Sequence, residues 1–150
     1  MRRALLLTAS LLVAAACGDG GIIEPAGTQP QLSVTGAGAC QGVQGVWSET
    51  GNPVTGQFSG FLTGDLEGTT QTQADVVPPG FTGQVVHGAG THTLTLNGGG
   101  VLQLESKWVI ANGRLNSSYK IVDGGRGSIT AHGPFIPDNL VMRYQGSVCR

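Results

Sequence analysis

Apolar and polar residues alternate with a period of two in the segment QFSGFLTGDLEGTT, residues 57–70. Phe58, Leu62 and Leu66 fall on one face of this segment, interleaved with glycines. Successive side chains of a β-strand point to opposite sides of the sheet, so this period predicts a strand with one buried face. The interleaved glycines are typical of strongly coiled strands that pack closely against their neighbours.

A second pair of alternating runs surrounds a glycine-rich turn. In THTLTLNGGGVLQLESKWVI, residues 91–110, His92 and Leu94 share a face before the turn, and Leu104 and Trp108 share a face after it. Two alternating runs joined by a short turn that begins with Asn-Gly predict an antiparallel hairpin.

Three further alternating runs follow, at residues 115–121, 128–132 and 140–148. Tyr119 lies in the first of them, and Met142 and Tyr144 share a face in the last. Turns are predicted at Asn-Gly before residue 114 and at DGGRG, residues 123–127. The two prolines of GPFIP, residues 133–137, disfavour a central strand between the last two runs. No helical period is found after the first sixteen residues.

The pattern predicts an all-β domain over residues 40–150. The chain contains 26 glycines and only 11% charged residues, which agrees with strands and turns. A sheet with one apolar face must cover it, and a barrel does so by closing on itself, which also removes exposed edges. We therefore expect a single antiparallel β-barrel of about eight strands, wide enough for side chains or one small ligand. A two-sheet β-sandwich is the alternative.

The N-terminus has the pattern of a secretory signal. Arg2 and Arg3 precede an uncharged apolar segment from Ala4 to Ala16 that ends in small residues. This segment is shorter than the roughly 20 residues that a membrane-spanning helix needs. We expect residues 1–16 to be a helical signal peptide that is removed on export.

The small residues before Cys17 resemble the processing site of bacterial lipoproteins, with Ala14 where leucine is usual. The resemblance implies that Cys17 is acylated and becomes the first residue of a mature chain anchored to a membrane of the cell envelope. An ordinary signal peptide, cut after Ala16, is the alternative. Residues 17–39, rich in glycine with Pro25 and Pro30, are expected to be a flexible linker between the anchor and the domain.

The chain has three cysteines, Cys17, Cys40 and Cys149. An odd number in an exported protein leaves one thiol to explain. If Cys17 carries lipid, Cys40 and Cys149 remain as a pair that an oxidising compartment would join, close to the two ends of the domain. A Cys17–Cys40 bond or a free thiol is the alternative.

Two segments resemble the allene oxide cyclase-like β-barrel group. They are FSGFLTGDLEGTT, which contains Gly64-Asp65-Leu66-Glu67-Gly68, and YKIVDGGRGSITAHGPF, residues 119–135. The resemblance extends over roughly residues 43–148 and implies a barrel whose cavity, in the plant cyclases, shapes a reactive fatty-acid epoxide. Their polar cavity residues have no match here, so no catalytic residue is carried over.

Individual side chains give little sign of chemistry. Asp65 and Glu67 are expected to be a solvated surface pair on the polar face. His87, His92 and His132 have no metal-ligand spacing, and His92 is interpreted as a hydrogen-bonded structural residue. No serine lies in a nucleophile elbow, and no metal or cofactor is expected. The net charge of −1 argues against a nucleic-acid partner.

The favoured hypothesis is therefore a noncatalytic exported barrel that binds a small apolar ligand or serves in the cell envelope. Its alternatives are a cyclase- or isomerase-like enzyme and a protein-interaction module. The residues expected to line a ligand cavity are Phe58, Leu62, Leu66, His92, Leu94, Leu104, Trp108, Tyr119, Met142 and Tyr144.

Overall fold

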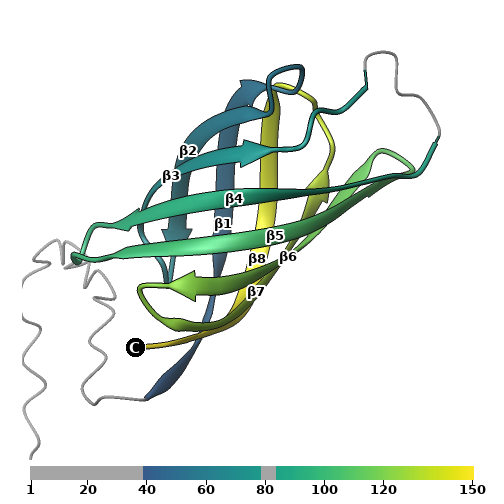
Figure 1. Ribbon diagram of the computed structural model, residues 1–150. Coiled ribbons are helices and arrows are strands. Elements are labelled where there is room, and N and C mark those ends of the chain that lie inside the picture. Colours follow the sequence, from purple (N-terminus) through teal and green to yellow (C-terminus); the bar gives the residue numbers. More distant parts are fainter. Residues whose placement is uncertain (1–38, 79–83) are drawn as a thin grey trace, which may run out of the picture.

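A computed structural model describes residues 39–78 and 84–150 of the protein. This part of the chain forms one closed barrel of antiparallel strands, in which each strand pairs with the next and the last pairs with the first (Figure 1). The strands are β1 (Cys40–Asn52), β2 (Gln57–Gly64), β3 (Gly68–Ala74), β4 (Val86–Leu96), β5 (Val101–Ala111), β6 (Arg114–Asp123), β7 (Arg126–Pro134) and β8 (Asn139–Cys149).

The barrel closes where β1 pairs with β8. The pairing runs without interruption from Cys40 opposite Cys149 to Thr50 opposite Asn139. It confirms the predicted barrel and excludes the two-sheet sandwich. A disulfide bond between Cys40 and Cys149 joins the two strands at one end of this seam, which confirms the predicted pairing of these cysteines and excludes a Cys17–Cys40 bond.

The segment 57–70 is two strands and not one. β2 ends at Gly64, whose φ of +106° is readily adopted only by glycine, and residues 65–67 form the turn into β3. Leu66 nevertheless remains buried, because its side chain belongs to the hydrophobic core of the barrel. The alternation continues across the turn because Leu66 is buried there. A period of two does not distinguish such a buried turn residue from a residue of a strand.

The inner glycines allow the strands to coil tightly. A Cβ atom placed on Gly60 of β2 would lie 1.8 Å from the backbone oxygen of Ser48 in β1. No side chain can occupy that space, so the close approach of these strands requires glycine at this position.

The two ends of the barrel differ. We call the end with the Cys40–Cys149 bond the disulfide end, and the end where β1 finishes and β8 begins the mouth end. Large apolar side chains pack together inside the barrel toward the disulfide end. They are Val43, Leu62, Leu66, Leu94, Leu96, Leu102, Leu104, Ile121, Ile129, Tyr144 and Val148, all buried.

The predicted signal peptide, most of the predicted linker and the predicted lipidation site at Cys17 lie outside the described residues. Within residues 39–78 and 84–150, no helix is long and apolar enough to cross a bilayer.

Candidate functional site

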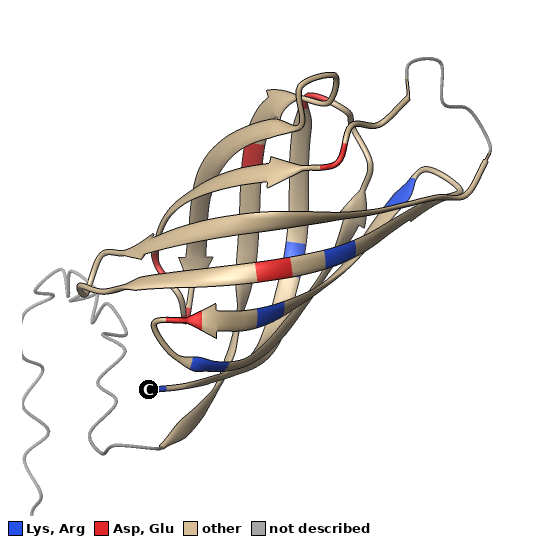
Figure 2. Cartoon of the chain, viewed as in Figure 1, with Lys and Arg blue, Asp and Glu red and all other residues tan. Residues whose placement is uncertain are grey.

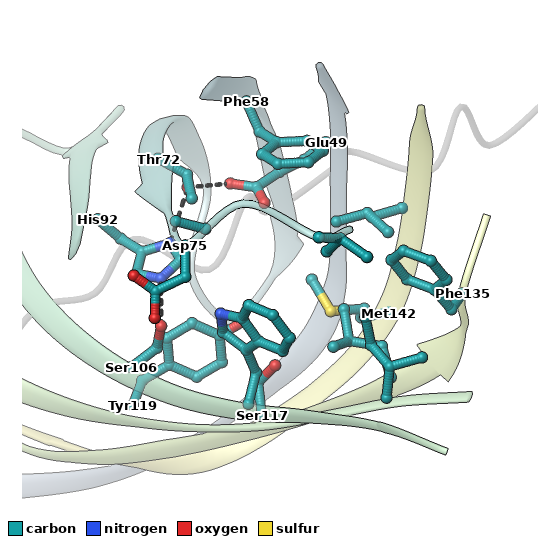
Figure 3. A pocket seen from close by; sticks show the side chains of 16 residues that line it. Glu49, Phe58, Thr72, Asp75, His92, Ser106, Ser117, Tyr119, Phe135 and Met142 are labelled. Atoms are coloured by element: carbon teal, nitrogen blue, oxygen red, sulfur yellow. Dashed lines mark hydrogen bonds between the residues drawn. The ribbon is translucent and has the colours of Figure 1, made fainter. Parts of the chain in front are cut away.

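A cavity of about 40 Å³ lies inside the barrel toward the mouth end. This is room for about one to three water molecules or for the end of a small ligand. Figure 3 shows the side chains around it. The cavity is lined by Glu49, Phe58, Thr72, Ala74, Asp75, Val77, His92, Ser106, Trp108, Ile110, Leu115, Ser117, Tyr119, Phe135, Leu140 and Met142.

The floor of the cavity is a network of buried polar side chains from four strands, which we call the polar layer: Glu49, Thr70, Thr72, His92 and Ser106. Thr70 and Thr72 both donate hydrogen bonds to Glu49 Oε1, with O–O distances of 2.7 and 2.5 Å. The hydroxyl of Thr72 also lies 2.7 Å from His92 Nδ1, and Ser106 Oγ lies 2.8 Å from His92 Nε2. Pairing between β3, β4 and β5 brings Thr72, His92 and Ser106 together, because each faces inward at neighbouring positions.

The hydrogen bonds of the polar layer fix the tautomer of His92. A threonine hydroxyl has one hydrogen, and Thr72 donates it to Glu49. His92 Nδ1 must therefore carry a proton and donate to Thr72, so that Nε2 of the neutral ring accepts from Ser106. The four side chains form one directed series of hydrogen bonds from Ser106 through His92 and Thr72 to Glu49.

His92 is neutral in this environment. Burial lowers its pKa from 6.5 to about 4, because the charged ring would lose its hydration. Trp47 contacts the ring edge-on at 5.5 Å between centroids, and Tyr119 does so at 4.9 Å. Trp47 and Tyr119 in turn stack at 4.6 Å. These contacts hold the imidazole in place below the cavity.

Tyr119 brings a hydroxyl to the same region. Burial raises the pKa of Tyr119 well above its usual value, although a hydrogen bond with Ser117 opposes the shift, and the charge of Glu49 raises it further. The phenol is therefore protonated at neutral pH and can either donate or accept a hydrogen bond.

Asp75 and Trp108 lie closer to the mouth. The carboxylate of Asp75, at the end of β3, accepts a hydrogen bond of 2.7 Å from the backbone amide of Ala89. The indole nitrogen of Trp108 donates to the backbone oxygen of the same residue at 3.1 Å. Ala89 thus positions one carboxylate and one aromatic ring of the cavity.

Only some of the residues that were predicted from the sequence to line a cavity do so in the structure. Five of them line it: Phe58, His92, Trp108, Tyr119 and Met142. The other five, Leu62, Leu66, Leu94, Leu104 and Tyr144, are buried but do not line it. They pack toward the disulfide end as part of the hydrophobic core. Sequence alternation selects the inward face but does not distinguish the hollow part of a barrel from the filled part.

Tyr144 has a structural role that the sequence did not indicate. Its hydroxyl accepts a hydrogen bond of 2.9 Å from the amide of Leu66 and lies 3.2 Å from the backbone oxygens of Thr63 and Leu66. It therefore holds the turn between β2 and β3 across the disulfide end. Burial is the largest cause that raises the pKa of Tyr144, to about 12.

Sequence reasoning missed four of the five members of the polar layer, which are Glu49, Thr70, Thr72 and Ser106. Glu49 follows Trp47 at a spacing of two, and the threonines alternate in the same way. This spacing was the available signal that they face inward. Hydrophilic residue types concealed it, because such residues are usually found on the solvent side.

The remaining candidates lie elsewhere. Asp65 and Glu67 are partly exposed in the turn after β2, and not on the polar face of a strand as predicted; Asp65 accepts a hydrogen bond of 2.9 Å from the amide of Gln44. His87 and His132 are exposed on the outside of the barrel. Among the described residues, no three histidine, cysteine or acidic side chains gather closely enough to hold a metal ion.

Comparisons with protein-family models, with curated proteins and with solved structures found no match for this chain.

Proposed function

We propose that the protein is an exported lipoprotein, anchored through Cys17, whose barrel binds a small and mostly apolar ligand in the cavity at the mouth end. The binding is noncatalytic in this proposal. The observation that carries it is the contrast between the polar layer at the cavity floor and the apolar walls above it. Small-molecule sites are commonly apolar pockets with a few polar groups that fix orientation.

The cavity walls support this proposal. They consist mainly of aromatic and aliphatic side chains, and most of the polar groups gather at the floor, with Asp75 nearer the mouth. A ligand with an apolar body and a single polar group would match both parts. The walls are formed by Phe58, Val77, Trp108, Ile110, Leu115, Phe135, Leu140 and Met142.

The position of the chain within the barrel also supports it. The chain enters the barrel at Cys40, at the disulfide end, and the cavity lies toward the opposite end. An anchor at Cys17 would therefore leave the mouth unobstructed by the linker attachment.

Binding can be tested with 1-hexanol as a neutral probe. The protein would be the full chain with Cys17→Ser, which carries no acyl group and needs no detergent. Titration followed by NMR is expected to shift the indole N–H signal of Trp108, because this side chain lines the cavity. Ala74→Leu, which fills the cavity from β3, should abolish the shift. Gln73→Leu on the exposed face of the same strand is the matched control. An unchanged Trp108 signal at saturating probe would refute binding of a neutral apolar ligand in this cavity.

One observation favours a second candidate, the cyclase- or isomerase-like enzyme. Ser106 and Glu49 both line the cavity and are joined through His92 and Thr72, along which a proton can pass. Such a relay would support acid–base chemistry without a cofactor. Deuterium uptake from D₂O into cyclohexanone, followed by proton NMR, is the test. A rate equal to that with the His92→Gln chain would eliminate this candidate.

A further inference from the structure

The charged side chains that line the cavity are all acidic. Two carboxylates line it, Glu49 at the floor and Asp75 nearer the mouth, and no lysine or arginine of the described residues does. His92 adds no positive charge, because burial keeps its ring neutral at pH 7. The side chains of Lys107, Lys120 and Arg143 are exposed and point away from the barrel interior. Figure 2 shows in blue and red how few charged positions the strands contain.

Glu49 is a buried carboxylate without a basic partner in the part of the chain that the structure describes. Its side chain is only 2% exposed, and its hydrogen bonds come from the neutral hydroxyls of Thr70 and Thr72. Buried charges in proteins are normally paired, because their removal from water is costly. A positively charged group in the cavity would supply the missing partner.

The polar layer also has few hydrogens left to donate. Thr70 and Thr72 donate their hydroxyl hydrogens to Glu49, and His92 donates its Nδ1 proton to Thr72. The Ser106 hydroxyl lies 2.8 Å from His92 Nε2 and 3.4 Å from the backbone oxygen of Gly90, so its hydrogen is also directed to an acceptor within the protein. Both hydrogen bonds to Glu49 reach Oε1, and Figure 3 shows the second carboxylate oxygen pointing away from Thr72. The layer therefore offers acceptors to a ligand, and Tyr119 and Ser117 are the hydroxyls that can take either role.

The aromatic side chains of the cavity walls would also favour a positively charged ligand. Phe58, Trp108, Tyr119 and Phe135 all line the cavity. The face of an aromatic ring attracts a cation within about 6 Å, and this attraction is largest where water is excluded. The two carboxylates, the aromatic walls and the lack of free hydrogen-bond donors in the polar layer thus all favour a positively charged ligand.

We propose that the ligand of this cavity is a small organic amine, bound as its ammonium ion. The ammonium group lies against Glu49 at the floor, and the apolar part of the molecule extends along the walls toward the mouth. This inference rests on the proposed ligand-binding function and specifies the chemical class of its ligand. It disfavours carboxylates such as fatty acids, for which Glu49 and Asp75 are repulsive.

Three probes with the same six-carbon chain test the proposal: hexylamine, 1-hexanol and hexanoate, each titrated at pH 7 into the Cys17→Ser chain. Binding would be followed by the Trp108 indole signal and by calorimetry. Hexylamine is expected to bind at least about tenfold more tightly than 1-hexanol, since hydrogen bonds to charged groups exceed neutral ones by about that factor. Hexanoate should bind most weakly.

Glu49→Gln should remove the preference of hexylamine over 1-hexanol, because the amide keeps an acceptor for the two threonines and loses the charge. Glu105→Gln, on the exposed outer face of β5, is the matched control and should retain the preference. A proton–nitrogen NMR spectrum would establish that each variant is folded.

The outcomes separate the two proposals. If 1-hexanol or hexanoate binds as tightly as hexylamine, the amine inference is overturned and the ligand-binding function stands. If Glu49→Gln leaves the preference intact, the assignment to Glu49 is overturned. If none of the three probes binds to the folded chain, both proposals fail.

Discussion

Acid should destabilise the barrel through His92. Burial lowers the pKa of this residue from 6.5 to about 4, whereas the unfolded chain has the ordinary value. Between these two values the unfolded state binds a proton that the folded state does not, so stability is complete above 6.5 and falls as the pH decreases toward 4. The full shift corresponds to about 3 kcal/mol, of which about 2 kcal/mol is lost at pH 5.

Urea unfolding at pH 7.5 and at pH 5.0, followed by tryptophan fluorescence with the disulfide intact, measures this loss. His92→Gln provides the comparison, because glutamine offers a donor and an acceptor to Thr72 and Ser106 and does not titrate. The unsubstituted chain is expected to lose about 2 kcal/mol more than this variant between the two pH values. His87→Gln, at an exposed position, should behave like the unsubstituted chain. Equal losses in the presence and absence of His92 would refute the argument.

Three further predictions follow from individual residues. Gly88→Ala should lower the free energy of unfolding by about 1–3 kcal/mol and alter tryptophan fluorescence, because the new Cβ would lie 2.0 Å from the Trp108 ring. Gly98→Ala, at a position with open space around it, should change neither property, and urea unfolding curves followed by fluorescence measure both. Cys149→Ala opens a loop with a sequence separation of 109 and should lower the free energy of unfolding by about 4 kcal/mol, measured in urea. Cys17→Ser should abolish labelling of the chain with radioactive palmitate in bacterial cells; continued labelling would exclude this cysteine as the acylated residue.

The alternating runs predicted the later part of the barrel well. The hairpin between β4 and β5 is present, and its turn contains Gly99 and Gly100 with positive φ. The first strand was not outlined as an alternating run, although the total of about eight strands was correct. Gly45 and Glu49 interrupt the apolar face of β1, so only Val43 and Trp47 mark its inward side. An interior glycine and an interior carboxylate do not produce the apolar signal on which the pattern depends.

The cavity was less accessible to sequence reasoning than the fold. Thr72 lies 20 residues from His92 and 23 from Glu49, and the contacts between them depend on the register of the strands. A shift of one residue would turn any of these side chains to the outer surface. Alternation could place His92 inside, but only the paired strands reveal that a threonine connects it to a buried acid. Whether the interior is filled or hollow depends on the combined side-chain volumes of all strands.

The pairing of β1 with β8 has a consequence for the folding of the protein. β1 pairs with β2 on one side and with β8 on the other, and this second pairing cannot form until the final eleven-residue strand, Asn139–Cys149, has been synthesised. Closure of the barrel therefore requires nearly all of the domain, and contacts between residues so far apart in sequence form slowly. The disulfide bond between Cys40 and Cys149 likewise can form only after this last strand has been synthesised.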